Sequence, residues 1–354
     1  MSRRRVRKKG ARTHGASFPP VLLAVVLLVL GLLGSCGRGL LEDTTREGSE
    51  GPGNVAVDRF FVEPDAGPGP VLTELRAART SLDVVVYLLT NREAVDELIE
   101  AHERGVRVRV MVEEDPFGGG AGNGAALRRL SATGVEWKYG NPTFRYTHQK
   151  AIIADGRHAL VMTANLTKSA FTRNREYIAL LTSPEEVREI QAMFDADWDR
   201  RRYEPRAASL VVSDVNSRMK LLGLIREARE SLDIEAEVMA DREIRSALVS
   251  AHERGVRVRI VMSPPEREES SYEGLSELAR AGVGVRVVTT PYIHSKSILA
   301  DGRRAYIGSV NFTATSMDQN RELGILTTSP SVLRKLGETF DQDWEKGEPF
   351  EGGR

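Results

Sequence analysis

The nine residues AHERGVRVR occur twice in this chain of 354 residues, at positions 101–109 and again at 251–259. A second pair of similar segments, ARTSLDVVVYLL at 78–89 and ARESLDIEAEVM at 228–239, precedes them at the same offset. Similarity at a fixed offset indicates an internal duplication, in which each half folds into a similar unit. The duplication constrains the fold more than any other feature, and it allows each half to be compared with the other.

Helical and strand patterns alternate within each half. Apolar residues in EAVDELIEAHERG, residues 93–105, recur at helical spacing, and VRVRVMV, residues 106–112, alternates as a strand does. Gly105 follows the helical pattern at the position expected for a helix C-terminus. Strands that alternate with helices predict an α/β fold of two similar lobes, each a mixed sheet flanked by helices.

The N-terminus has the features of an export signal. Seven basic and no acidic side chains lie before residue 36, and residues 21–33 form an apolar run that is too short for a typical spanning helix of about 20 residues. The following LGSC resembles the lipobox of bacterial lipoproteins, which predicts lipidation of Cys36. Cys36 is the only cysteine, so no disulfide can form within the chain. An incidental thiol or an uncleaved anchor helix is the alternative.

Composition divides the chain into four segments. Residues 1–35 are predicted to be a signal peptide, and residues 36–69, rich in Gly, Pro, Glu and Asp, a flexible tether. Residues 70–205 and 206–347 are predicted to be the two lobes. Beyond residue 35 the chain carries 43 basic and 50 acidic side chains. This balance counts modestly against sequence-independent binding of nucleic acid.

A set of five polar residues recurs in both halves at identical spacing. Residues 147–165 read THQKAIIADGRHALVMTAN and residues 293–311 read IHSKSILADGRRAYIGSVN, and each segment is followed by NRE. Counted from the histidine, both halves have lysine at +2, aspartate at +7, asparagine at +17 and glutamate at +28. These residues are His148, Lys150, Asp155, Asn165 and Glu176, matched by His294, Lys296, Asp301, Asn311 and Glu322.

The spacing suits a pocket for a phosphate oxyanion. Each histidine is expected to open a strand, so that it and the lysine two positions later project from one face. Asp-Gly is expected to close a tight hairpin turn, after which the returning strand brings the asparagine back towards them. Lysine is scarce, with nine against 41 arginines, yet it occupies both +2 positions. A compact ammonium donor is not interchangeable with the planar fork of arginine.

The two segments resemble the paired HKD motifs of the phospholipase D superfamily, and the resemblance extends from about Val71 to Trp344. It implies that the lobes pack about a pseudo-twofold axis and that both motifs form one site. One histidine would attack phosphorus to form a covalent phosphohistidine, and the other would protonate the leaving alcohol. By analogy His148 is the nucleophile and His294 the acid, although this sequence alone allows the reverse.

The resemblance also implies roles for the remaining residues. The lysines and asparagines would bind the phosphate oxygens, and the hydroxyls of Thr163 and Ser309 could add hydrogen bonds. Met162-Thr163 stands where Gly-Ser is usual, and the bulk of Met162 could reduce room for the substrate. Carboxylates such as those of Glu176 and Glu322 could orient the imidazoles.

The resemblance groups Asp155 and Asp301 with the catalytic histidines and lysines, but in the sequence itself the Asp-Gly pairs favour a role in shaping the turns. Neither a metal nor a cofactor is expected, because the lysines supply positive charge and no His/Cys/carboxylate cluster has the spacing of a metal site.

A phospholipid at a membrane surface is the favoured substrate, because a lipidated tether would concentrate the protein there. The protein would be exported and anchored in a bacterial envelope, as a monomer whose lobes form an intramolecular pseudo-dimer. Three alternatives remain: a cardiolipin synthase-like transferase, a metal-independent nuclease and a non-catalytic lipid-binding relative. A nuclease would need a local basic groove, which could include arginines near the motifs: Arg145, Arg173, Arg175 and Arg321.

Overall fold

The computed structural model describes residues 54–117, 122–266 and 270–352. The predicted signal peptide, Cys36 and most of the predicted tether lie outside these residues. Among the described helices, none combines the length and the apolar character needed to cross a bilayer.

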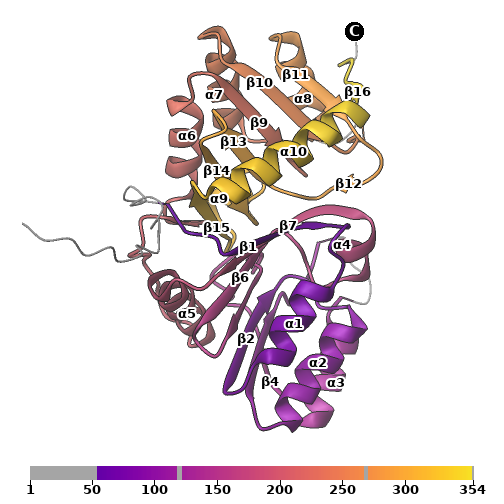
Figure 1. Ribbon diagram of the computed structural model, residues 1–354, viewed down its shortest axis with the longest axis vertical. Helices are drawn as coiled ribbons and strands as arrows, with labels where there is room; N and C mark the ends of the chain where they lie inside the picture. Colours follow the sequence, from indigo (N-terminus) through magenta and orange to yellow (C-terminus); the bar gives the residue numbers. More distant parts are fainter. Residues whose placement is uncertain (1–53, 118–121, 267–269, 353–354) are drawn as a thin grey trace, which may run out of the picture. The chain divides into compact units, whose positions relative to one another are not determined.

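The N-terminal lobe is a mixed sheet with the strand order β1-β7-β6-β5-β2-β3-β4, to which β12 adds by pairing with β7. Helices α1 to α3 cover one face, and α5 contacts strands β2, β5 and β6 (Figure 1). The elements are β1 (Arg59–Glu63), α1 (Gly69–Ala77), β2 (Ser81–Val86), α2 (Arg92–Glu103), β3 (Arg107–Val112), α3 (Gly124–Thr133), β4 (Glu136–Tyr139), β5 (Ala151–Ala154), β6 (His158–Met162), α4 (Lys168–Thr172), β7 (Asn174–Leu181) and α5 (Pro184–Trp198).

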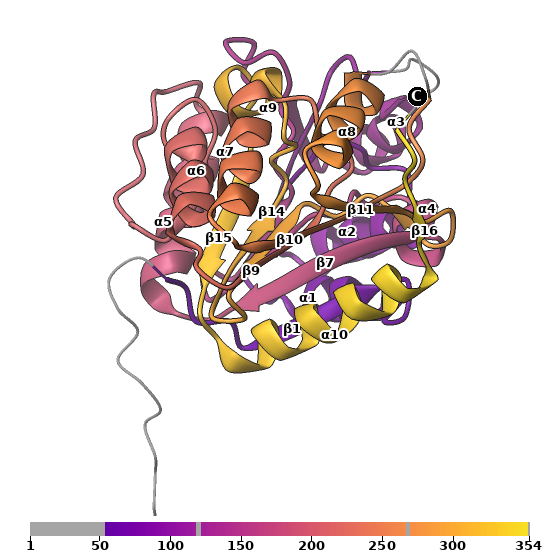
Figure 2. The ribbon, with the colours of Figure 1, turned by 90° about the horizontal axis from the view of Figure 1, so that it is seen from above.

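The C-terminal lobe repeats this plan with the strand order β16-β11-β10-β9-β13-β14-β15-β8. Helices α6 to α8 lie on the opposite side of its sheet from α10 (Figure 2). The elements are β8 (Leu210–Val212), α6 (Ser217–Glu227), β9 (Ser231–Glu235), α7 (Arg242–Glu253), β10 (Arg257–Met262), α8 (Ser270–Arg280), β11 (Gly284–Val287), β12 (Tyr292–Ile293), β13 (Ser297–Ala300), β14 (Arg304–Gly308), α9 (Ala314–Asp318), β15 (Leu323–Thr327), α10 (Pro330–Lys346) and β16 (Glu348–Pro349).

The repeated nonapeptide forms the same helix-to-strand connection in both lobes. It ends α2 and begins β3 in one lobe, and it ends α7 and begins β10 in the other. Gly105 and Gly255 follow the helices with φ of 88° and 91°, in the left-handed region that favours glycine. The predicted α/β fold of two similar lobes, each with a mixed sheet, is confirmed.

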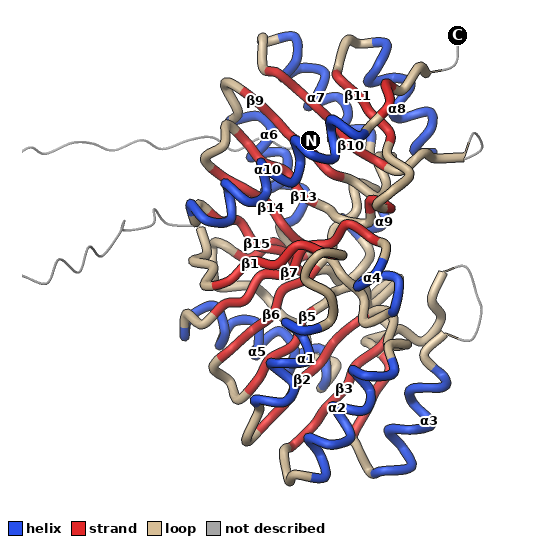
Figure 3. The backbone as a smooth tube through the Cα atoms, turned by 45° about the vertical axis from the view of Figure 1, so that its right-hand side comes forward, coloured by secondary structure: helices blue, strands red, loops and turns tan. Residues whose placement is uncertain are grey.

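Three large apolar clusters hold the fold together, and a small fourth one contains Val261, Val288, Ile293 and Phe340. One packs α1 to α3 against the N-terminal sheet, and a second packs α6 to α8 against the C-terminal sheet. The third contains side chains from both halves, including Ile153, Phe194, Ile307 and Leu336. The tube in Figure 3 shows strands β1, β7 and β15 at the junction of the lobes. Because one apolar cluster is shared, burial of its side chains couples the lobes.

Part of the predicted tether is folded. Residues 59–63 form β1, which pairs antiparallel with β7, and Val55 is buried with its N–H bonded to the carbonyl oxygen of Leu326. The sequence RFFVE lies in a segment rich in glycine and proline, so the composition of that segment did not indicate a strand. The strand is stabilised by its pairing with the sheet. The prediction that residues 54–69 are flexible is therefore wrong.

Candidate active site

The backbone around each motif histidine is bound to the other half of the chain. The N–H of His148 donates to the carbonyl oxygen of Arg321 at 2.8 Å, and the N–H of His294 donates to that of Arg175 at 3.3 Å. Strand β12, just before His294, pairs with β7, and Thr147 forms the reciprocal bridge with Arg321. These exchanged contacts have the reciprocity of a pseudo-twofold arrangement, and they bring the two histidine segments to one junction.

Each histidine is also oriented by the glutamate of the opposite half. Nδ1 of His148 lies 2.8 Å from Oε2 of Glu322, and Nδ1 of His294 lies 2.7 Å from Oε1 of Glu176. Both glutamates are fully buried. Contact at Nδ1 fixes each imidazole ring and leaves Nε2 as the nitrogen available for chemistry. The sequence predicted the partners of the histidines but not their exchange between halves.

Burial and neighbouring charges shape the ionisation of this cluster. Burial lowers the pKa of His148, against the opposing influence of Glu322. Burial acts to raise the pKa of Glu322, but the attraction of His148 and its hydrogen bond outweigh this and lower it. Burial also acts to raise the pKa of Glu176, but His294, Lys296 and the hydrogen bond from Thr163 together lower it. Both carboxylates are therefore ionised near neutral pH and hold Nδ1–H of their imidazole partners.

The motif lysines are buried beside the histidines. Nζ of Lys150 donates to the carbonyl oxygen of His148 at 2.6 Å, and burial lowers the pKa of Lys150 to about 7. Nζ of Lys296 makes the equivalent bond to the carbonyl oxygen of His294. The histidines do not open strands as predicted, since β5 begins at Ala151 and β13 at Ser297. Bonds between the halves, rather than strand pairing, hold the histidines in place.

The motif asparagines follow the returning strands, as predicted. Asn165 comes three residues after β6 and accepts a hydrogen bond from the N–H of Leu88 through Oδ1 at 3.3 Å. Asn311 comes three residues after β14, and its Nδ2 donates to Glu237 at 3.1 Å.

The hydroxyls of Thr163 and Ser309, expected to bind phosphate, bind protein groups instead. Both residues are fully buried. Oγ1 of Thr163 donates to Glu176 at 2.6 Å and accepts from the N–H of Tyr177. Oγ of Ser309 donates to the carbonyl oxygen of Leu323 and accepts from its N–H. The expectation of substrate contact is wrong, because these hydroxyls support the glutamate-bearing segments behind the histidines.

Asp155 and Asp301 form turns, as their alternative interpretation predicted, and they are not brought to the histidines. Both have positive φ values, 56° and 54°, at the hairpin turns after β5 and β13. The carboxylate of Asp155 accepts hydrogen bonds from the N–H groups of residues 79–81. That of Asp301 accepts the matching set from residues 229–231. Their grouping with the catalytic residues is therefore corrected to a structural role.

Met162 does not narrow the site. Its side chain is fully buried in the apolar cluster of the N-terminal lobe. At its counterpart Gly308, a Cβ atom would lie 2.8 Å from the hydroxyl oxygen of Tyr306 and closer still to the backbone of β15. Leu160 is the counterpart of Tyr306. The N-terminal lobe thus combines a large Met162 with a smaller Leu160, and the C-terminal lobe combines Gly308 with the larger Tyr306. The presence of Met-Thr in place of Gly-Ser is therefore explained by packing in the core.

Two of the four arginines proposed for a basic groove are buried in ion pairs. Arg175 binds Asp343 at 2.5 Å, and Arg321 binds Asp197 at 2.9 Å. Each pair joins the two halves, because each aspartate comes from the last helix of the opposite lobe. The guanidinium groups of Arg175 and Arg321 are therefore committed to the interface between lobes, although Arg321 also lines a surface hollow together with residues 200–202, which are all arginines.

Sequence comparison of the halves missed two residues beside the motifs. Tyr87 and Glu237 occupy equivalent positions in the two halves. Tyr87 directly follows strand β2, and Glu237 comes two residues after the matching strand β9. The Tyr87 ring packs edge-on against His148, with centroids 4.8 Å apart. The Glu237 carboxylate lies 2.6 Å from Nζ of Lys296 and 3.4 Å from Nε2 of His294. The position differs between the repeats, so identity between the halves does not mark it.

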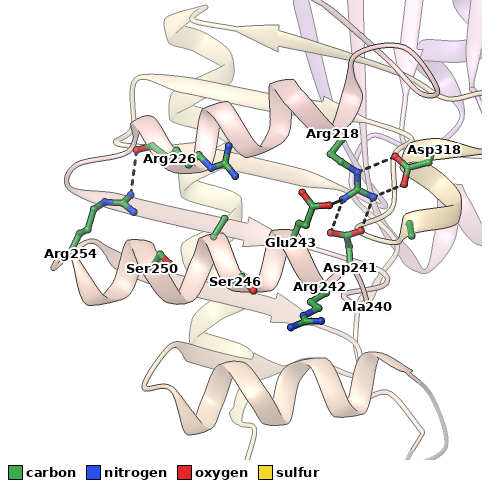
Figure 4. A pocket seen from close by; sticks show the side chains of 12 residues that line it. Arg218, Arg226, Ala240, Asp241, Arg242, Glu243, Ser246, Ser250, Arg254 and Asp318 are labelled. Atoms are coloured by element: carbon green, nitrogen blue, oxygen red, sulfur yellow. Dashed lines mark hydrogen bonds and ion pairs between the residues drawn. The ribbon is translucent and has the colours of Figure 1, made fainter. Parts of the chain in front are cut away.

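Other parts of the described chain offer weaker candidates. No group of three or more His, Cys, Asp or Glu side chains there is arranged to hold a metal ion. A hollow of about 970 Å³ between α6 and α7 contains none of the motif residues (Figure 4). Four arginines and three acidic residues line the hollow, and Arg218 binds all three acidic residues, Asp241, Glu243 and Asp318. The motif junction is the stronger site.

Comparisons with known proteins agree with this geometry. The sequence model of the family described as "Cardiolipin synthase, PLD-like domain" matches residues 71–198 and 221–344. A mitochondrial cardiolipin hydrolase of Danio rerio is 32% identical over 134 residues, which cover 37% of this chain and 58% of the relative. A probable cardiolipin synthase of Bacillus subtilis (strain 168) is 25% identical over 324 residues, which cover 78% of this chain and 64% of the relative. The chain thus spans about 60% of the length of these curated relatives.

A solved structure shares the fold at low sequence identity. The phosphatidylserine synthase of Haemophilus influenzae Rd KW20 superposes with a TM-score of 0.67 at 13% identity, covering 85% of this chain and 89% of the other. At that identity the likeness supports the two-lobed fold alone.

Proposed function

This chain belongs to the family described as "Cardiolipin synthase, PLD-like domain", and from that premise we propose that it cleaves the head-group phosphodiester of phospholipids through a covalent phosphohistidine. The observation that carries the proposal is the exchange of histidine partners. Each imidazole is held at Nδ1 by a glutamate of the other half. Two rings oriented in this way present Nε2 atoms for nucleophilic attack and proton transfer.

The proposed reaction has two steps. In the first, Nε2 of one histidine bonds to phosphorus while the bond to the alcohol oxygen breaks, and the second histidine gives that oxygen its proton. In the second, the oxygen of water or of another alcohol bonds to phosphorus, the P–N bond breaks, and the second histidine takes the incoming proton. The ammonium groups of Lys150 and Lys296 and the amides of Asn165 and Asn311 would stabilise charge on the phosphate oxygens.

Phospholipid is favoured as substrate for two reasons. The curated relatives include a cardiolipin hydrolase and a probable cardiolipin synthase. In addition, the guanidinium group of Arg175 is taken up by a buried ion pair with Asp343, which removes one cation from the groove that a nuclease would need. Water as acceptor gives hydrolysis, and a lipid alcohol gives transfer of the phosphatidyl group. Both outcomes use the same intermediate.

The test uses the chain from about residue 40 and its H148N variant, assayed with EDTA on phosphatidylcholine, phosphatidylglycerol and single-stranded DNA. Head-group release that the variant loses supports the proposal, and cardiolipin formed from phosphatidylglycerol identifies transfer. Cleavage of DNA without lipid turnover would replace the proposal with a nuclease. Inactivity on all three substrates, with lipid binding retained, would indicate a non-catalytic relative.

The proposed location is a bacterial membrane surface, reached by export and lipidation of Cys36. We expect C36S to lose acyl labelling and to leave the membrane fraction. Retention of C36S in membranes would instead support an anchor helix near residues 16–33.

A further inference from the structure

The two halves of the site differ most at the position shared by Tyr87 and Glu237. In the N-terminal half an aromatic ring lies there, and Nζ of Lys150 is 5.6 Å from its centroid. In the C-terminal half the carboxylate of Glu237 lies there, and 20% of the surface of this side chain is exposed to solvent. The substitution therefore puts a carboxylate in direct contact with the second motif and an aromatic ring in contact with the first.

Glu237 contacts three polar residues of its motif, His294, Lys296 and Asn311. One carboxylate oxygen lies 2.6 Å from Nζ of Lys296 and accepts a hydrogen bond from Nδ2 of Asn311 at 3.1 Å. The other lies 3.4 Å from Nε2 of His294. Burial acts to raise the pKa of Glu237, but His294 and Lys296 outweigh it and hold the pKa far below its usual range. The group is thus an ionised carboxylate at the working nitrogen of His294.

The two imidazoles consequently face different hydrogen-bonding environments. His294 has a carboxylate near each ring nitrogen, Glu176 at Nδ1 and Glu237 at Nε2, so an acceptor lies within reach of a proton on either nitrogen. Nζ of Lys296 lies 3.3 Å from Nδ1 and is the cation nearest to this ring. His148 faces Glu322 at Nδ1, with the cation Lys150 nearby, and no hydrogen bond or ion pair of its Nε2 is found among the described residues. Its Nε2 lone pair is therefore free.

We propose that Glu237 is the positioning residue that makes the two histidines inequivalent, by holding a proton on Nε2 of His294. This inference rests on the proposed phosphodiesterase function and assigns the roles within it. His148 forms the bond to phosphorus, and His294 gives its Nε2 proton to the alcohol oxygen as the P–O bond breaks. The 3.4 Å separation is long for an N–H···O bond, so the proton remains transferable.

The test compares leaving groups, because a good leaving group needs no proton. Wild type, E237Q and E237D are assayed on methyl aryl phosphate diesters with 4-nitrophenol or phenol as the leaving alcohol. We expect E237Q to lose about a hundredfold in kcat on the phenyl ester and less than about threefold on the nitrophenyl ester. E237D, which keeps a carboxylate, should recover part of the loss. KM should not rise, because removing the charge frees Lys296 for phosphate.

The Y87F variant is the matched control at the equivalent position. It keeps the ring beside His148, so its rates on the two esters should change by the same factor. Equal losses on both esters in E237Q, with an unchanged thermal midpoint, would overturn the proposal and leave Glu237 a structural role.

A second measurement does not depend on turnover of any lipid. Nitrogen NMR of the histidine rings at pH 7 should show both nitrogens of His294 protonated in the wild type and Nε2 deprotonated in E237Q, with His148 singly protonated in both. Identical His294 spectra in the two proteins would refute the role of Glu237, even in a protein that cleaves no phospholipid. Inactivity on lipids alone would refute only the proposed substrate.

Discussion

The N-terminal and C-terminal halves of the candidate active site share a histidine, a lysine, an asparagine and a glutamate and differ in some of the residues around them. In one half Thr163 donates a hydroxyl hydrogen bond to Glu176. In the other, the equivalent Ser309 also hydrogen-bonds Glu322, and Ser316 of helix α9 adds a second hydroxyl where the first half has Ala170. The hydroxyl beside each glutamate is thus shared by the halves, and Glu322 has one hydroxyl partner more than Glu176. The comparison shows that the duplicated chain kept the motif residues while part of their support diverged.

The same comparison separates symmetric from asymmetric features of the site. Interface pairs such as Arg175–Asp343 and Arg321–Asp197 obey the pseudo-twofold relation. Tyr87 and Glu237 do not obey it. Symmetric contacts would bring the histidines together, whereas the asymmetric position would give them different roles.

The largest expected effect comes from removing either histidine. We expect H148N and H294N each to lower turnover of phosphatidylcholine by at least about a thousandfold, because each ring carries a separate step. H158N is the matched control, since His158 forms a peripheral pair with Glu74 outside the motifs. Head-group release is the measurement. A variant of either motif histidine that keeps full activity would show that one half alone is sufficient.

Loss of an interface aspartate tests the structural symmetry. We expect D197N and D343N each to lower the free energy of unfolding by about 3–5 kcal/mol, because each leaves a buried guanidinium group without its anion. Urea unfolding followed by circular dichroism measures the effect. A large loss in one variant and none in the other would mean that the two pairs do not contribute equally to the interface.

The glutamates test the exchange between halves. We expect E322Q and E176Q each to reduce kcat about a hundredfold, because a neutral amide no longer fixes the tautomer of the opposite imidazole. Nitrogen NMR of the histidine rings then shows which histidine each glutamate contacts. E322Q should perturb the signals of His148 and spare those of His294, and E176Q should do the reverse. The opposite assignment would place each glutamate with the histidine of its own half.

The pH dependence of anion binding tests the lysine of the first half. The pKa of Lys150 is lowered to about 7 by burial, so its ammonium form is present below that pH and is lost as the pH rises through it. Affinity for dimethyl phosphate, a monoanion throughout this range, should fall about tenfold between pH 6 and 8.5. Titration calorimetry measures this, with K150M as the variant that should bind weakly at both values.

The turn aspartates should give the smallest effect. We expect D155N and D301N to cost about 1–2 kcal/mol of stability, because each weakens hydrogen bonds to three backbone N–H groups. Turnover by the folded protein should stay within about twofold. A large loss of kcat at unchanged stability would show that these aspartates take part in catalysis.

Much of the fold and part of the site could be predicted from the repeat. Identical spacing revealed the histidines, lysines and asparagines, and the alternation of patterns revealed the α/β lobes. The exchange of Glu176 and Glu322 between halves could not be predicted, because it depends on how two separately encoded sheets pack. Arg175 was misjudged as exposed for the same reason, since its partner Asp343 lies 168 residues away.

Other predictions were wrong because the type of a residue does not reveal which way its side chain points. The hydroxyls of Thr163 and Ser309 have the right chemistry for phosphate, but at the ends of buried strands they point to backbone groups and to a glutamate. Glu237 was missed because its counterpart is tyrosine, and a search for shared residues passes over a position where the copies differ.

The most direct test of the central claim is a crystal structure with orthovanadate, which mimics phosphorus under attack. The account predicts vanadium bonded to Nε2 of His148, with an oxygen on its far side within hydrogen-bond distance of Nε2 of His294. Vanadate bound to one motif only, with the other histidine too far away to reach it, would contradict a single site built from both halves of the chain.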